Sequence, residues 1–137
     1  MSFDVFLNFD GNCRAALDFY ADVFKAEPTQ TMTYGDAPGM PVADADIARI
    51  LYASLPVFGH NVMFSDCPSE SEYVKGTNIA LTLGCEDKPE IERLFTALSD
   101  GGEVTMPLGK TFFSEYYGMV TDKFGITWQL SYTKFAV

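Results

Sequence analysis

"KFGITWQLS", residues 123–131, decides the fold, because "VFGHNVMFS" at 57–65 repeats its pattern 66 positions earlier. Each copy reads as a Phe-Gly turn followed by a strand that alternates between apolar and polar residues. In the later copy Trp128 and Leu130 fall on one face of the strand, and Gln129 falls on the other. An internal repeat of this kind predicts a duplicated supersecondary unit.

Each copy belongs to a longer β-α-β-β-β pattern. Alternation with period two predicts eight strands, at 3–9, 29–35, 47–57, 60–66, 77–85, 103–109, 116–123 and 126–132. Apolar residues at helical spacing predict helices within 11–26 and 88–102. We therefore expect one domain over 1–137, made of repeated modules at about 1–66 and 77–137. The fold class expected is α+β, with two βαβββ modules forming curled mixed sheets and the helices outside.

The polar faces of these strands predict a cavity. The apolar faces are expected to pack on the helices. The opposite faces carry amides and hydroxyls, which a closed core would not tolerate without hydrogen-bond partners. Two such sheets, curled to face each other, would form a cup lined by these groups. The sequence leaves open whether the cup lies within one chain or between two chains.

Composition excludes several classes of partner. Nine Lys and Arg against 19 Asp and Glu give a net charge of −10, which repels the phosphates of nucleic acids. No apolar run approaches the roughly 18–20 residues of a membrane span, and "MSFDVFLNFDG" lacks the basic region of a signal peptide. We expect a cytoplasmic protein with three reduced cysteines, because no CxxC pair occurs. Without a P-loop or GxGxxG motif, no nucleotide cofactor is expected.

Three stretches carry a resemblance to a known family. "FDGNCRAALDFYADVF" (9–24), "VMFSD" (62–66) and "FFSEYYGMVTDKFGITWQL" (112–130), within the paired modules, resemble the PhnB-like branch of the vicinal oxygen chelate (glyoxalase/bleomycin-resistance/dioxygenase) superfamily. The resemblance covers essentially the whole chain. It implies a homodimer, and it implies a cup in which catalytic members hold one divalent metal through His or Glu of the first, fourth, fifth and eighth strands.

Carrying those metal positions over by strand frame gives Asp4, Met63, Asn78 and Gln129. Hard divalent ions prefer carboxylates and transition metals prefer imidazole, so a carboxylate, a thioether and two amides suit neither. We therefore expect no cofactor, with a retained divalent metal as the alternative. Because the superfamily's usual chemistry needs that metal, the sequence leaves enzymatic activity open.

Further residues complete the expected ligand-binding cup. Arg49, amid apolar residues of its strand, would meet an anionic ligand group or form a salt bridge at the sheet edge. His60, the only histidine, reads as a turn residue and excludes a His-based triad. The aromatic segment 112–117 predicts a binding wall or lid, or else a dimer interface. The full set of candidate cup residues is Asp4, Asn8, Arg49, Met63, Asn78, Thr82, Phe113, Tyr116 and Gln129.

Three functions remain as hypotheses. The first is a metal-free protein that binds a small molecule, in the manner of the superfamily's resistance proteins. The second is a metal-dependent lyase, isomerase or dioxygenase with an atypical ligand set. The third is a partner-binding dimer whose cup is vestigial. The ligand's identity does not follow from the sequence.

Overall fold

The computed structural model describes residues 1–132 and divides the chain into two compact units, with the boundary between Val74 and Lys75. The expected second module, 77–137, includes residues 133–137, which lie outside the described residues. That the chain forms a single domain stays a prediction.

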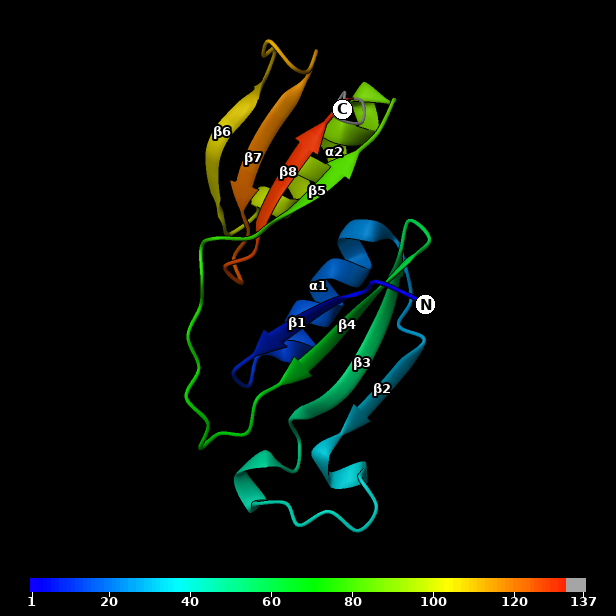
Figure 1. Ribbon diagram of the computed structural model, residues 1–137, viewed down its shortest axis with the longest axis vertical. Helices are drawn as coiled ribbons and strands as arrows, with labels where there is room; N and C mark the ends of the chain where they lie inside the picture. Colours follow the sequence, from blue (N-terminus) through cyan, green and yellow to red (C-terminus); the bar gives the residue numbers. More distant parts are fainter. Residues whose placement is uncertain (133–137) are drawn as a thin grey trace. The chain divides into compact units, whose positions relative to one another are not determined.

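The first unit is a four-stranded mixed sheet with one α-helix (Figure 1). Its elements are β1 (Val5–Phe9), α1 (Cys13–Phe24), β2 (Gln30–Thr33), the 3₁₀ turns η1 (Tyr34–Asp36) and η2 (Asp44–Asp46), β3 (Ile50–Val57) and β4 (His60–Asp66). The strand order is β1-β4-β3-β2. The β1–β4 pair is parallel and the other pairs are antiparallel.

The second unit has the same architecture. Its elements are β5 (Ala80–Gly84), α2 (Lys88–Ser99), β6 (Glu103–Gly109), β7 (Tyr117–Thr121) and β8 (Thr127–Ser131). The order β5-β8-β7-β6 matches that of the first sheet, again with its outer pair β5–β8 parallel. The predicted α+β class with two βαβββ modules is therefore confirmed.

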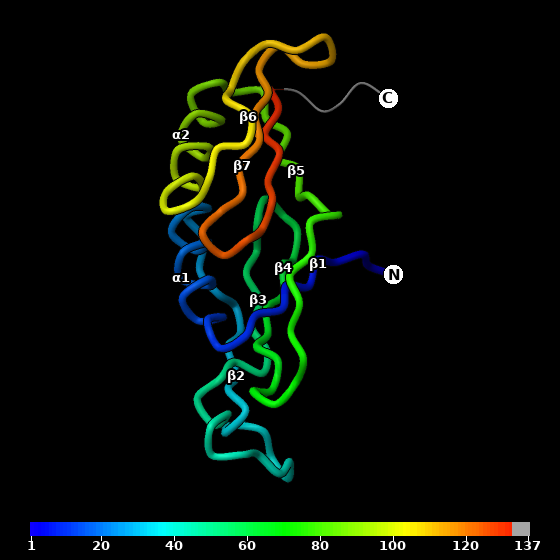
Figure 2. Tube along the Cα trace, turned by 90° about the vertical axis from the view of Figure 1, so that its left-hand side faces the viewer, coloured from blue at the N-terminus to red at the C-terminus, as the bar shows by residue number. Residues whose placement is uncertain are grey.

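In each unit the helix covers one face of its own sheet, as Figure 2 shows from the side. Helix α1 packs against β3 and β4, and α2 packs against β6, β7 and β8. The core of the first unit is aromatic: Tyr20 of α1 lies 5.9 Å from Phe64 of β4 between ring centroids, and Phe9 lies 6.2 Å from Phe64. All three side chains are buried, so burial of the apolar stripe holds each helix on its sheet.

The repeat offset is constant only along the second strand of each hairpin. Leu55 pairs with Val62 in the first unit, and Val120 pairs with Trp128 in the second. The offset is thus 128 − 62 = 66 between β4 and β8, but 120 − 55 = 65 between β3 and β7. One extra residue in the second turn explains the difference.

Three strands, β1, β3 and β5, begin two or three residues later than the alternation predicts, and this displaces three candidate residues. Asp4 precedes β1, Arg49 precedes β3, and Asn78 precedes β5. The expectation that Arg49 lies on the third strand is therefore wrong. Its backbone N–H donates to Asp46 O at 2.9 Å in the turn after η2, so it is not part of the β-ladder. Within residues 1–132, no helix is both long and apolar enough to cross a membrane.

Candidate functional site

The sheet of the second unit turns a polar face away from α2. Trp128 and Leu130 are buried, whereas Gln129 between them is only half-buried. Gln129 pairs in register with Thr82 of β5 on one side and Met119 of β7 on the other. The Thr82 hydroxyl donates to Gln129 Oε1 at 3.3 Å. The structure therefore brings two predicted site residues, Thr82 and Gln129, into direct contact.

The other hydroxyls of this face pair with one another. Thr121 and Thr127 place their Oγ1 atoms 3.4 Å apart across β7 and β8. Ser114 and Ser131 place their Oγ atoms 2.8 Å apart. Of the polar groups on this face, Gln129 uses the least of its hydrogen-bonding capacity within the described residues, because the bond from Thr82 occupies only its amide oxygen.

The corresponding row of the first unit is less polar. Met63 occupies the position of Gln129, and its register neighbours are Phe6 of β1 and Ser54 of β3. The Ser54 Oγ lies 2.6 Å from Thr29 Oγ1, so this hydroxyl is already paired. Asn8, one of the predicted cup residues, is exposed on β1. Its backbone carbonyl accepts a hydrogen bond from the Tyr73 hydroxyl at 3.0 Å.

Asp4 and Asn78 lie outside these two rows. Both are exposed, and Asp4 Oδ2 accepts a hydrogen bond from Ser2 Oγ at 2.7 Å. The parallel register places Phe6 beside Met63 and Thr82 beside Gln129. Asp4 therefore lies 6 − 4 = 2 residues before Phe6, the register neighbour of Met63. Asn78 lies 82 − 78 = 4 residues before Thr82, the register neighbour of Gln129.

The donor atoms of the two rows do not fit a divalent metal. Their side chains offer thioethers, hydroxyls, an aromatic ring and one amide, but neither imidazole nor carboxylate. His60 is exposed and pairs with Val57 beside the turn. In the part of the chain that the structure describes, no three His, Cys, Asp or Glu side chains gather as a metal site.

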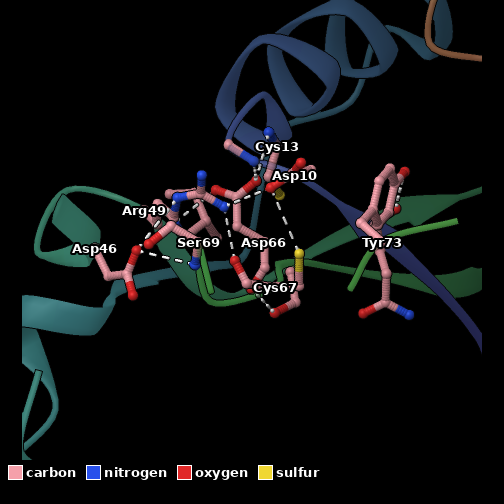
Figure 3. A network of polar contacts seen from close by, with 12 residues as sticks. Asp10, Cys13, Asp46, Arg49, Asp66, Cys67, Ser69 and Tyr73 are labelled. Carbon is pink, nitrogen blue, oxygen red and sulfur yellow. Dashed lines mark hydrogen bonds and ion pairs between the residues drawn. The ribbon is translucent and has the colours of Figure 1, made fainter. Parts of the chain in front are cut away.

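Arg49 belongs to a separate network of polar contacts in the first unit (Figure 3). Its Nη1 lies 3.0 Å from Asp10 Oδ1, and its Nε lies 3.5 Å from Asp46 Oδ1. Nη1 also donates to the Cys67 carbonyl at 2.8 Å. The interpretation as a salt bridge thus describes what Arg49 does in this structure; binding an anionic ligand group stays a prediction.

The backbone at Gly11 passes close to the guanidinium of Arg49. Gly11 has φ +91°, and a Cβ added there would lie 3.2 Å from Arg49 Nη2. Both the left-handed backbone and the guanidinium beside it therefore favour glycine at this position. Within the stretch 9–24, Asp10 therefore pairs with the same guanidinium that Gly11 accommodates.

Sequence reasoning missed Asp66, the centre of Figure 3. This buried carboxylate accepts backbone hydrogen bonds from Gly11 at 2.8 Å, Cys13 at 3.0 Å and Ile50 at 2.9 Å. It thereby ties the end of β4 to the start of α1 and the start of β3. Asn12, the N-cap residue of α1, makes no side-chain cap bond, so Asp66 serves the first N–H groups of this helix. The available signal is an Asp at the last position of a predicted apolar strand.

The segment after β4 is fastened to the first unit. The Cys67 thiol donates to Asp10 Oδ1 at 3.7 Å, and the Ser69 N–H donates to Asp46 Oδ1 at 3.1 Å. Burial, followed by the charge of Asp10, raises the pKa of the Cys67 thiol above its usual value. Burial likewise raises the pKa of Cys13 to about 12. Neither thiol is therefore set up as a nucleophile, since the thiolate is the reactive form.

The predicted aromatic residues separate into two environments. The Tyr116 hydroxyl donates to Glu92 Oε1 of α2 at 2.9 Å, and this hydrogen bond raises the pKa of Tyr116. Phe113 packs edge-on against the ring of Tyr117, with centroids 5.0 Å apart. Tyr117 pairs with Ser131, two residues along the strand from Gln129. Phe113 therefore borders the Gln129 face, whereas the Tyr116 hydroxyl is engaged by the helix.

Comparison with known proteins gives consistent relatives. Residues 2–131 match the model of a family described as 3-demethylubiquinone-9 3-methyltransferase. Protein YjdN of Escherichia coli is 30% identical over 147 residues, covering 98% of this chain and 97% of YjdN. The crystal structure of protein PA1353 from Pseudomonas aeruginosa is 36% identical, with a TM-score of 0.88 and 96% of each chain covered. A PhnB protein from Bacillus cereus is 27% identical, with a TM-score of 0.80, and the match covers 96% of this chain and 98% of that one.

A more distant likeness concerns the fold alone. The fosfomycin resistance protein FosX of Listeria monocytogenes, solved as a mutant with Mn(II) and a dihydroxypropylphosphonic acid, has a TM-score of 0.64 at 12% identity. The match covers 98% of this chain and 93% of FosX. With a family match over residues 2–131, a relative that is 30% identical over nearly the whole chain and a PhnB protein among its structural neighbours, the chain belongs to the PhnB-like family, which is described as 3-demethylubiquinone-9 3-methyltransferase.

Proposed function

We propose that the chain is a metal-free protein that binds a small molecule on the open sheet face around Gln129. The observation that carries this proposal is the row formed by Thr82, Gln129 and Met119, in register across three strands and on the face opposite α2. A half-buried amide beside apolar side chains is typical of ligand sites, which combine an apolar lining with a few oriented polar groups.

The alternative function is a metal-dependent lyase, isomerase or dioxygenase. Its support is the fold shared with FosX, whose structure contains Mn(II). The donor atoms on the strands of this chain argue against it, because amide and thioether groups are weak partners for such ions. The family description names methyl transfer, but this sequence contains neither a P-loop nor a GxGxxG motif for a nucleotide-containing methyl donor.

Elemental analysis tests the proposal. Protein purified without chelator should carry well under one equivalent of divalent metal per chain. As a positive control, Thr82→His, Met119→His and Gln129→Glu together should create measurable nickel or zinc affinity, because register neighbours stand roughly 4.5–5.5 Å apart between Cβ atoms. About one tightly held metal ion per wild-type chain would overturn the proposal and favour the enzyme.

A homodimer is the second part of the proposal, and exposed apolar groups on the second unit support it. Phe112 is 100% exposed, and Val104 of the edge strand β6 is 43% exposed. Exposed edge strands and large exposed apolar side chains are commonly covered by a partner chain.

Sedimentation at micromolar concentration should therefore report about twice the chain mass of 15.2 kDa. If the aromatic segment 112–117 forms the interface, Phe112→Ser should shift the equilibrium toward monomer. If this segment serves as a lid instead, the sedimenting mass should not change. As a control, Phe58→Ser changes a 59% exposed phenylalanine in the first unit and should leave the mass unaltered. A wild-type monomer would contradict the prediction.

A further inference from the structure

The chemistry of the Gln129 face restricts the class of ligand that the proposed function would involve. Three hydroxyl contacts are closed within the protein, namely Thr82 to Gln129, Thr121 with Thr127 and Ser114 with Ser131. The Gln129 amide oxygen accepts one of them. Among residues 1–132 no contact is recorded for Gln129 Nε2, so its two N–H groups remain to donate.

The surroundings of that amide are apolar and polarisable. Met119 pairs directly with Gln129, and Met106 pairs with Met119 on the next strand. Phe113 and Tyr117 form an edge-on aromatic pair beside the same face. Thioethers make favourable contacts with aromatic rings, and unbranched methionines adapt to the shape of a bound group. This lining suits a flat aromatic group.

The charge on the face excludes anions. Among the described strand residues whose pairing places them on this face, none is Lys or Arg, and Glu103 alone is charged. The whole chain carries a net charge of −10. A phosphonate or carboxylate would lose water there without gaining a cationic partner, and such groups are normally held by arginine forks or metals. Arg49, the candidate for an anion, is held by Asp10 and Asp46 in the other unit.

We propose that the face around Gln129 binds an uncharged aromatic ligand that accepts a hydrogen bond from Gln129 Nε2 through a carbonyl oxygen. This inference rests on the proposed function and adds the ligand's class to it. It also separates this chain from FosX, whose structure holds a phosphonic acid together with Mn(II). The shared fold thus serves different ligand chemistry in the two proteins.

Three probes with one aromatic skeleton test the inference. Methyl 1-naphthyl ketone offers the ring and the acceptor, 1-ethylnaphthalene offers the ring alone, and 1-naphthylphosphonic acid replaces the acceptor with an anion. Calorimetric titration of the full chain should show the ketone binding about five- to tenfold more tightly than the hydrocarbon, the worth of one hydrogen bond. The phosphonic acid should bind least well of the three.

Gln129→Leu supplies the decisive comparison, because leucine keeps the volume and removes the donor. It should lower ketone affinity to that of the hydrocarbon and leave hydrocarbon affinity unchanged. The side-chain amide resonances that vanish in Gln129→Leu identify Gln129 in the wild-type spectrum, and the saturated ketone complex should shift them further than the saturated hydrocarbon complex does. Gln30→Leu is the matched control, an exposed glutamine of β2 in the other unit, and should change neither affinity.

Several outcomes would overturn the inference. One is tighter binding of the phosphonic acid than of the ketone, and another is an equal loss for all probes in Gln129→Leu. Absence of binding by every probe would also overturn it, and if Gln129→Leu then changed the sedimenting mass, the face would belong to a second copy of the chain. Failure of the proposed function is distinguishable, because it would appear as a stoichiometric metal in the elemental analysis.

Discussion

Asp66→Ala should lower the free energy of unfolding by about 3–5 kcal/mol, measured by urea denaturation followed by circular dichroism. Asp66 is 1% exposed and accepts the backbone N–H groups of Gly11, Cys13 and Ile50. Removing the carboxylate leaves three donors without their partner at the point where β4, α1 and β3 meet. Each buried donor left unpaired costs roughly 1–3 kcal/mol, less whatever water can recover.

Two variants control this prediction. Asp10→Ala removes the exposed carboxylate that pairs with Arg49, and should cost within about 1 kcal/mol because exposed ion pairs contribute little. The free energy of unfolding of Asp66→Asn should lie between those of wild type and Asp66→Ala. The amide keeps one accepting oxygen for Gly11 and Cys13 but turns a donor toward the N–H of Ile50. Equal losses for Asp10→Ala and Asp66→Ala would contradict the role assigned to Asp66.

Asp122→Ala should destabilise the protein by about 2–4 kcal/mol in the same measurement. Asp122 is 3% exposed and accepts hydrogen bonds from Phe124 N at 2.9 Å, Ile126 N at 3.1 Å and Trp128 Nε1 at 2.8 Å. The first two bonds close the turn between β7 and β8. The third fixes the indole that packs on the helix side of the sheet.

A double-mutant cycle with Trp128→Phe isolates the indole contact. Phenylalanine keeps an aromatic ring but lacks the N–H donor. The two substitutions together should cost about 1 kcal/mol less than the sum of the single losses, because each alone breaks the same hydrogen bond. Additive losses would show that the Asp122 carboxylate acts only through the turn.

The sequence predicted the elements well because their signals are local. Alternation places Trp128 and Leu130 on one face and Gln129 on the other, and the structure buries the former two. The site rows could not be predicted in the same way. The partner of Gln129 is Thr82 and not Asn78. That choice is set by the register of parallel pairing between strands more than 40 residues apart, and a local sequence pattern does not contain this register.

The network around Asp66 was unpredictable for a different reason. Its three donors come from the loop before α1, the first residue of α1 and the first residue of β3, which are brought together only by the folded unit. Arg49 was misplaced on a strand because the apolar residues after it continue the alternation. Its actual position depends on the hydrogen bond of its own N–H to Asp46, which the pattern does not contain.

Trp128 is the chain's only tryptophan, and it lies in the second unit. Its emission therefore reports on the second unit alone, and its indole is anchored there by the hydrogen bond to Asp122. Far-ultraviolet dichroism, in contrast, sums both sheets and both helices. Superimposed transitions from the two signals would mean that the duplicated halves melt as one cooperative body. Separated transitions would mean that the two units unfold independently, each with its own free energy of unfolding.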